Sequence, residues 1–189
     1  MDTQSIKKHW SDKGETLYTY KMSQLDKKRL NERTRRFLTE CGLPRDAAPG
    51  LCFDSWESET IPTPNQVLRI DFKQLEDYLM IGSNGSGDPI CIDLKTNNEV
   101  VYLNHDNYFE RVFMNSSISQ LLQSISKYES FWASLNPRFE NNIFSKRRFS
   151  DEEYNQLKQD FWTIDNHCLD DNSCWLAELE GLLWERDNE

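Results

Sequence analysis

The stretch YLMIGSNGSGDPICIDLKTNNEVVYLNHDN, residues 78–107, decides the fold. Residues 77–82 and 89–93 are apolar at most positions, so each predicts a strand buried on both faces, and residues 83–88 predict the connection of a hairpin. A second turn at residues 95–98, where Asn97 and Asn98 tolerate a positive φ, leads to the apolar run 100–103. The stretch therefore predicts an antiparallel meander of at least three strands.

Helical patterns follow this meander. Ser117 and Gln120 form a capping-box pattern at the start of SISQLLQSISKYESFW, residues 117–132, whose apolar residues recur at helical spacing. One face of this helix is expected to lie across the sheet, and Pro137 is expected to end it. Ser150 with Glu153 predicts a further helix, and the apolar stripe of residues 175–183 predicts a last one.

The segment before the meander predicts one helix and two strands. The helix is expected over Met22–Gly42, and the strands over 51–53 and 67–72, where Leu68, Ile70 and Phe72 alternate with polar residues. The predicted class is α+β, with an antiparallel or mixed central sheet, helices packed on it and C-terminal helices. We expect one domain over residues 1–189, with a core of about 22–135 and an acidic helical extension over 136–189.

Charge narrows the class of partner. The chain carries 22 basic and 32 acidic residues, a formal net charge of -10, which argues against direct binding of nucleic-acid phosphates. Residues 151–189 hold 12 acidic residues against Lys158 and Arg186. This balance favours a basic macromolecular partner, or it only maintains solubility. A basic cluster in the first predicted helix is typical of a solvated face, with a polyanion site as the alternative: Lys27, Lys28, Arg29, Arg33, Arg35 and Arg36.

The cysteines and the apolar segments indicate a compartment. Five cysteines, odd in number and without a CxxC pair, are typical of a reducing environment. The first residues lack the apolar core of a signal peptide, and no window reaches the roughly 18 apolar residues of a membrane span. We therefore expect a cytoplasmic protein with no membrane association.

No residue pattern indicates catalysis. The glycines of GSNGSGD, residues 82–88, lack the Lys-Ser/Thr pair and the following helix of a phosphate loop, so we interpret them as hairpin residues with positive φ. His9, His105 and His167 are far apart, and no G-x-S-x-G motif is present. The sequence thus predicts no enzymatic activity, no metal site and no cofactor.

Several of these residues resemble a known family. The order runs from TRRFL (34–38) and GLP (42–44) through LCF (51–53), IGSNGSGDPICIDL (81–94) and EVVYLNHD (99–106) to a helix that ends near Phe131 and Trp132. This order resembles the SUKH superfamily, or SMI1/KNR4-like domain, and most closely its SUKH-4 group. The resemblance spans about residues 34–132 and depends on a pattern of strand, glycine loop and turn rather than on a catalytic signature.

The resemblance implies an α+β fold and an immunity protein that neutralises a bacterial nuclease or deaminase toxin. The expected partner is a basic toxin domain, with no direct contact to nucleic acid, and the chain is expected to be a monomer or weak homodimer. The alternative is a non-catalytic protein-interaction scaffold, as in other relatives.

Acids and aromatics near strand ends and loops are the candidate contact residues: Trp56, Glu57, Glu59, Asp71, Asp77, Asp88, Asp106 and Tyr108. Trp56, which lies among carboxylates, either contacts a partner or folds back over the sheet edge.

Overall fold

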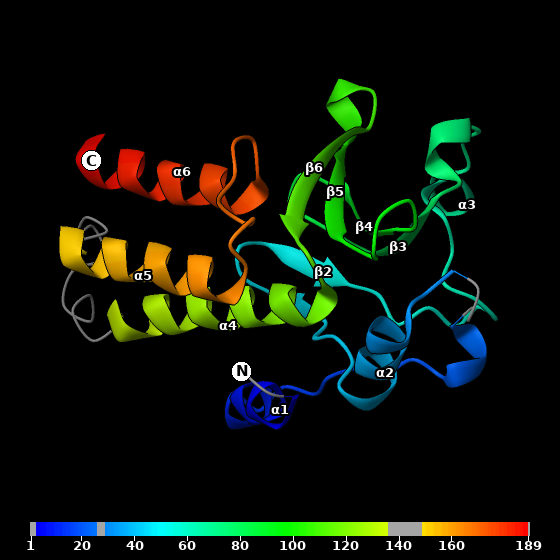
Figure 1. Ribbon diagram of the computed structural model, residues 1–189, viewed down its shortest axis with the longest axis horizontal. Coiled ribbons are helices and arrows are strands. Elements are labelled where there is room, and N and C mark those ends of the chain that lie inside the picture. Colours follow the sequence, from blue (N-terminus) through cyan, green and yellow to red (C-terminus); the bar gives the residue numbers. More distant parts are fainter. Residues whose placement is uncertain (1–2, 26–28, 136–148, 189) are drawn as a thin grey trace.

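The computed structural model describes residues 3–25, 29–135 and 149–188 (Figure 1). Within these ranges one antiparallel sheet has the strand order β1-β2-β3-β4-β5-β6. Its strands are β1 (Asp46–Ala47), β2 (Leu51–Phe53), β3 (Tyr78–Ser83), β4 (Pro89–Asp93), β5 (Val100–Asn104) and β6 (Glu110–Asn115). The α-helices are α1 (Thr3–Asp12), α2 (Glu32–Glu40), α3 (Pro64–Leu68), α4 (Ile118–Leu135), α5 (Asp151–Ile164) and α6 (Cys174–Asn188). Short 3-10 turns are η1 (Met22–Gln24), η2 (Lys73–Leu75) and η3 (His105–Asn107). The α+β class is confirmed.

The predicted meander forms the centre of the sheet. Strands β3 and β4 pair from Tyr78 opposite Asp93 to Ser83 opposite Pro89, and both are buried along almost their whole length. Asn98 has a φ of 64° in the turn before β5, as expected for a residue that tolerates the left-handed region. The sheet also contains β1 and β6, which the sequence did not indicate.

The glycines of the β3–β4 hairpin differ from the expectation. Gly87 has a φ of 85°, whereas Gly82 and Gly85 are outside the left-handed region. Gly82 is required for another reason, because a Cβ there would lie 2.1 Å from the carbonyl oxygen of Cys52 on the paired strand. The absence of a side chain lets β2 approach β3 closely.

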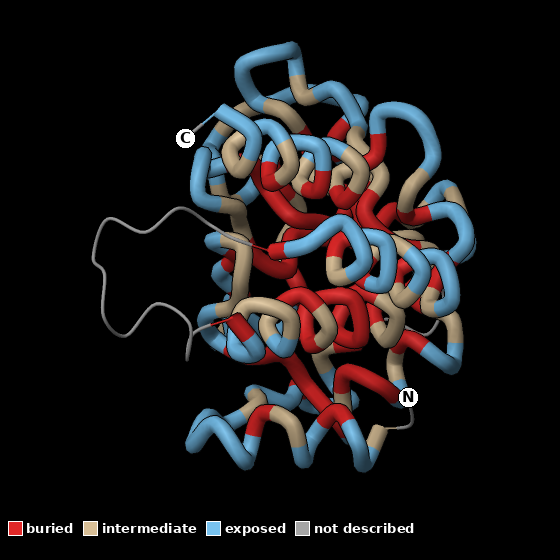
Figure 2. The backbone as a smooth tube through the Cα atoms, turned by 90° about the vertical axis from the view of Figure 1, so that its left-hand side faces the viewer, coloured by how far each residue is buried: buried red, intermediate tan, exposed pale blue. Residues whose placement is uncertain are grey.

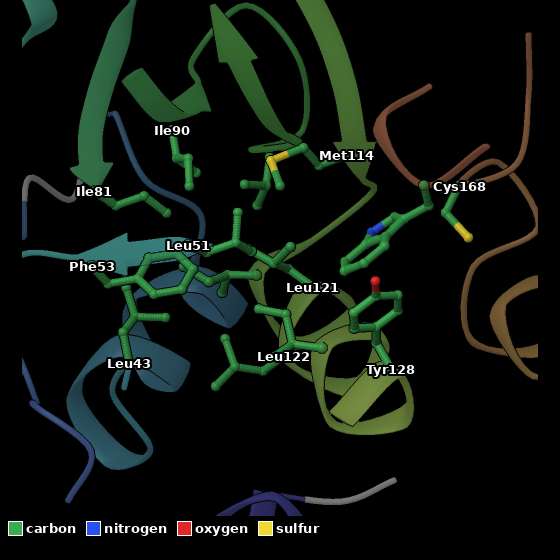
Figure 3. Close-up of a cluster of buried hydrophobic side chains, with 14 of the residues drawn as sticks. Leu43, Leu51, Phe53, Ile81, Ile90, Met114, Leu121, Leu122, Tyr128 and Cys168 are labelled. Carbon is green, nitrogen blue, oxygen red and sulfur yellow. The ribbon is translucent and has the colours of Figure 1, made fainter. Parts of the chain in front are cut away.

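Most of the core lies between the inner face of the sheet and the helices (Figure 3). Alternation along β3 and β4 places Leu79, Ile81, Ile90 and Ile92 on this face. At the start of helix α4 one half of the predicted capping box is present, because the Gln120 N–H donates to Ser117 Oγ. The Gln120 side chain accepts from the Ser117 hydroxyl group rather than from its backbone N–H. The buried face of the helix contributes Leu121 and Leu122, among others, to the same cluster, so the prediction that α4 lies across the sheet is correct. Figure 2 shows that the buried backbone runs through the middle of the molecule.

The outer face of the sheet carries a second, smaller cluster. It contains Leu75, Tyr78, Met80, Cys91, Val101 and Leu103. Residues of α3 and its flanks, Val67 and Ile70, pack against it, and Figure 1 shows α3 on the side of the sheet away from α4, α5 and α6. Among the residues that the structure describes, short elements cover this face.

One predicted element was wrong, and the helix predicted over 22–42 had the wrong start. The expected strand over 67–72 does not form: residues 67–68 end α3, and residues 69–72 are neither helix nor strand. Thr63 accepts the Gln66 N–H and Pro64 occupies the first turn, both of which favour a helix start. Arg69 then takes the left-handed conformation, with a φ of 56°, and ends the helix. The expected helix over 22–42 begins only at Glu32, because Asn31 caps it by accepting the Thr34 N–H and Leu25 is extended.

The C-terminal helices are confirmed. Ser150 and Glu153 form the predicted capping box of α5. Buried Asp165 follows α5 and accepts hydrogen bonds from the Ser116 N–H (2.6 Å) and from Asn115 Nδ2 (3.2 Å), which ties this segment to the end of β6. The expected helix end at Pro137 lies outside the described residues. The sequence did not indicate α1, which buries Ile6 and Trp10.

Candidate protein-binding site

Three segments form the outer layer of the molecule, over the second cluster. We define the outer layer as the Trp56 loop (54–60), the α3–η2 segment (64–77) and the β5–β6 loop (104–110). Val67, Ile70 and Phe109 pack against the second cluster, which places the α3–η2 segment and the β5–β6 loop on the same side of the sheet. Trp56 packs against both clusters, so its loop lies at the edge of the sheet. The β5–β6 loop is the green turn at the top of Figure 1, which projects away from the helices.

The β5–β6 loop has a fixed and unusual backbone. Asn104 Oδ1 accepts the N–H groups of Asp106 and Asn107, both at 3.1 Å, which closes the turn. Tyr108 and Phe109 follow with φ values of 52° and 60°, a region that residues with a Cβ adopt rarely and at a cost in free energy. Gln74 Nε2 donates to the Tyr108 carbonyl oxygen over 3.0 Å and ties the loop to η2.

Aromatic side chains are exposed at this corner. Tyr108 is 88% exposed, and Phe72 is 47% exposed. The Phe72 and Phe109 rings contact each other, with centroids 5.7 Å apart. A shallow depression of about 460 Å³ lies beside them, lined by residues that include Gln74, Tyr78 and Glu110. The corner thus offers an apolar surface whose margin carries Glu110 and also Lys95, which forms an ion pair with Asp77.

A carboxylate–imidazole pair supports the same loop. Asp88 Oδ1 accepts from the His105 N–H (2.9 Å) and bonds His105 Nδ1 (2.7 Å), and Asn84 Nδ2 donates to its other oxygen. Burial alone would raise the pKa of Asp88, but these hydrogen bonds outweigh it, and the pKa is lowered. The hydrogen bond to Asp88 raises the pKa of His105, and Asp106 lies 3.4 Å from the other ring nitrogen. The pair anchors the start of η3.

Trp56 does not project into solvent. Its Nε1 donates to the Met80 carbonyl oxygen over 2.8 Å and the ring is half-buried, so the ring is folded back over the sheet edge. Gln24 Nε2 donates to the carbonyl oxygens of Trp56 and Ser58, which holds the loop. Glu57 and Glu59 are exposed beside a depression of about 540 Å³ that Lys21 also lines.

The remaining predicted residues are distributed along the outer layer. Asp71 is exposed next to Phe72, and Asp77 is half-buried and forms an ion pair with Lys95 over 3.1 Å. Asp88 was expected to be exposed but is only 6% exposed, and its carboxylate bonds Asn84 and His105. Asp106 and Tyr108 are therefore brought together on one loop, with Asp71 next to Phe72 in the same layer, whereas Glu57 and Glu59 occupy a separate loop.

Sequence reasoning missed Phe72, Gln74 and Phe109 as members of this layer. Phe72 was placed inside a strand, and no local pattern marks Gln74 as the partner of Tyr108. The signal that was available is the run Asn107-Tyr108-Phe109-Glu110 after a strand, where two aromatics follow a turn residue.

Other chemistry is sparse in the ranges that the structure describes. No group of three or more His, Cys, Asp or Glu side chains there is arranged to hold a metal ion. Three arginines of the basic cluster make local contacts: Arg29 donates to the Glu76 carbonyl oxygen, Arg35 to that of Leu30, and Arg36 pairs with Glu40. Lys27 and Lys28 lie outside the described residues. None of the described helices has the length and apolar character to span a membrane.

Comparison with known proteins identifies the family. The family model described as SUKH-4 immunity protein matches residues 11–180 of the chain. No curated protein and no solved structure matches it. The match extends beyond the segment that carries the sequence resemblance and includes α4, α5 and part of α6. The chain belongs to the SUKH-4 immunity protein family.

Proposed function

We propose that the protein neutralises a cognate bacterial toxin, a nuclease or deaminase, by binding the basic surface on which that toxin holds nucleic acid. The observation that carries the proposal is membership of an immunity protein family together with a net charge of -10. An enzyme that binds nucleic acid needs Lys and Arg along its groove, and an acidic inhibitor matches that charge. The proposed action blocks access to the groove and makes or breaks no bond.

The proposed binding surface is the outer layer. It displays carboxylates and aromatic side chains together, and the two have different roles. Buried aromatic anchors supply most of the affinity of a protein interface, whereas surrounding charges mainly raise the association rate and select the partner. Tyr108 and Phe72 are exposed anchors of this kind, and Asp71, Asp106 and Glu110 are exposed carboxylates beside them.

The proposal also covers the compartment, the oligomeric state and the cofactor requirement. The protein acts in the cytoplasm as a single domain, either monomeric or weakly dimeric, and uses no cofactor. Its five cysteines are free thiols in the structure, which suits a reducing compartment.

The test is co-expression with the toxin encoded by the neighbouring gene. Cells that produce the toxin alone are expected to stop growing, and cells that also produce this chain are expected to grow. The two purified proteins, with the toxin catalytically inactivated, are expected to elute together from a sizing column at low salt. Absence of both rescue and complex would refute the proposal. A stable complex without rescue would favour the scaffold function instead.

A further inference from the structure

We infer that the β5–β6 loop imitates a nucleotide: the Tyr108 ring occupies the toxin's base-binding pocket, and Asp106 and Glu110 take the places of the flanking phosphates. The inference rests on the proposed function and adds to it the segment that enters the groove and the chemistry that the segment copies.

The exposure of Tyr108 is the first observation. At 88% exposed, it is the most exposed large hydrophobic side chain in the described part of the chain. Aromatic rings normally bury most of their surface, and Tyr and Trp are the side chains most enriched at the centres of interfaces. Its ring makes no contribution to the core that would account for this position, because the packing at this corner comes from the neighbouring Phe109.

The backbone is the second observation. Tyr108 and Phe109 both hold a positive φ, which a glycine or asparagine would adopt at lower cost. The conformation persists because Asn104 closes the turn, Gln74 holds the Tyr108 carbonyl and Asp88 holds His105. The ring is therefore presented in one backbone conformation before any partner binds, which lowers the entropy cost of association.

The charges beside the ring are the third observation. Asp106 and Glu110 lie two residues before and two residues after Tyr108, and both are exposed. Residues 104–110 contain no Lys or Arg. The next residue, Arg111, is held toward the sheet by Asp93, with 2.8 Å between Arg111 Nε and Asp93 Oδ2, and by Glu99. Along the chain, an exposed carboxylate therefore lies two residues to either side of the ring, and the loop contains no lysine or arginine. His105, the one basic side chain of the loop, has its Nε2 3.4 Å from Asp106 Oδ1.

This arrangement matches the chemistry of the proposed partner. Grooves for single-stranded nucleic acid combine aromatic platforms that stack bases with cations that follow the phosphates. Enzymes that act on a base hold it between apolar or aromatic side chains in a tight pocket. An exposed planar ring on a loop that also carries two exposed carboxylates offers a group of each kind.

The experiment measures binding to the inactivated neighbouring toxin by calorimetry. We expect Tyr108→Ala to raise the dissociation constant on the order of 30-fold, as for an interface anchor. Tyr108→Phe is expected to change the dissociation constant by less than about threefold. Trp184→Ala is the matched control, because Trp184 is 67% exposed on α6, outside the outer layer, and its loss is expected to change the constant by less than about twofold. Asp106→Asn with Glu110→Gln is expected to reduce the salt dependence.

A competition measurement tests the imitation itself. A short fluorescent single-stranded oligonucleotide, as DNA and as RNA, is bound to the inactivated toxin, and this chain is added. The unmodified chain is expected to displace the oligonucleotide, and Tyr108→Ala is expected to fail at the same concentration. A ternary complex of toxin, oligonucleotide and this chain would overturn the inference, as would unchanged affinity of Tyr108→Ala.

The two levels of failure are distinguishable. If the unmodified chain rescues growth and binds the toxin, and Tyr108→Ala does both equally well, the nucleotide imitation is wrong and the proposed function stands. No rescue by the unmodified chain would remove both. Misfolding is excluded by Tyr108→Gly, which relieves the positive φ and is expected to unfold at a higher temperature than the unmodified chain while it loses binding.

Discussion

Trp175 Nε1 donates a hydrogen bond to Asn115 Oδ1 over 2.8 Å, and both residues are fully buried. This contact joins the second residue of α6 to the last residue of β6. Trp175 also contacts the Phe161 ring of α5, with centroids 4.8 Å apart. The C-terminal helix, which the sequence marks by an apolar stripe within an acidic segment, is therefore fixed to the sheet by a buried polar contact and an aromatic contact.

Replacing Trp175 by Phe is expected to destabilise the fold by about 1–3 kcal/mol beyond the loss of volume, because Asn115 Oδ1 loses its donor while it stays buried. Trp10→Phe is the matched control. Trp10 is equally buried, but its Nε1 has no hydrogen-bond partner among the described residues. The change is the same in volume and removes no hydrogen bond. Urea unfolding followed by far-UV circular dichroism gives both values, and equal losses would contradict the role of the Trp175 contact.

Among the polar residues of the C-terminal segment, Asp165 is expected to lower the unfolding free energy most when it is replaced. It accepts from Ser116 N (2.6 Å), Ser116 Oγ (2.9 Å) and Asn115 Nδ2 (3.2 Å) while it is 3% exposed. Asp165→Ala leaves these donors without an acceptor and is expected to cost about 3 kcal/mol in the free energy of unfolding. Asp171→Ala, at an exposed position nearby, is expected to change it by less than about 0.5 kcal/mol. A similar loss for the two variants would contradict this assignment.

Alanine is expected to have opposite effects on stability at Gly82 and at Gly181. Gly82→Ala would place a Cβ 2.1 Å from the Cys52 carbonyl oxygen, so β2 must move, and we expect a loss of about 2–4 kcal/mol. Gly181 lies inside α6, where a Cβ meets nothing within 4 Å, and alanine there is expected to gain about 0.5–1 kcal/mol. Thermal unfolding of the two variants should shift in opposite directions. A tolerated Gly82→Ala would show that the close approach of β2 and β3 is not required.

The contribution of the His105–Asp88 pair to stability is expected to depend on pH. The pKa of His105 is raised above its ordinary value of 6.5, so its contribution to stability is complete below about pH 6.5 and is lost as the pH rises through the raised value. The pKa of Asp88 is lowered from 3.8, so its contribution is present above that value and is lost as the pH falls through the lowered one. The pair therefore contributes its full stabilisation between the ordinary pKa values of 3.8 for Asp88 and 6.5 for His105.

The measurement compares the unmodified chain with His105→Gln from about pH 5 to pH 9. The difference in unfolding free energy is expected to be largest at the acidic end and to shrink toward pH 9. His167, whose pKa is raised by a hydrogen bond to Asp170, titrates in the same direction but is present in both proteins, so its effect cancels. A difference that stays constant with pH would contradict the pairing.

The parts of the fold that the sequence predicted have strong local patterns. The β3–β4 hairpin was predictable because both of its strands are apolar on both faces, and α4 and α5 because each begins with a capping-box pattern. The strand expected at 67–72 was wrong because the alternation of Leu68, Ile70 and Phe72 was given more weight than the Thr63 capping box and Pro64. Edge strand β6 was missed because only its last two residues are fully buried.

The candidate site was less predictable than the fold. Tyr108 and Asp106 were chosen as polar or aromatic residues near a strand end, and they do lie together on an exposed loop. Asp88 has the same local pattern but is buried, because His105, 17 residues later, donates to it. Such a contact depends on how β4 and β5 pair, and the local sequence does not encode it.

Charge reversal of Glu57 and Glu59 tests how far the binding surface extends. Both carboxylates are exposed on the Trp56 loop, so Glu57→Lys with Glu59→Lys is expected to leave the fold intact. If the loop faces the toxin that we propose as partner, association is expected to slow and its salt dependence to flatten. The dissociation rate is expected to change little, because exposed rim charges act on the encounter. Stopped-flow mixing at several salt concentrations gives both rates.

The matched control for this charge reversal lies outside the outer layer. Asp171 precedes α6 and Glu180 lies within it, and both side chains are exposed. Asp171→Lys with Glu180→Lys changes the net charge by the same amount as the Glu57 and Glu59 pair, so a general effect of charge is equal in the two double variants. A local effect at the Trp56 loop slows association more in the Glu57 and Glu59 variant. Equal slowing would show that only net charge matters and that the Trp56 loop is not part of the interface.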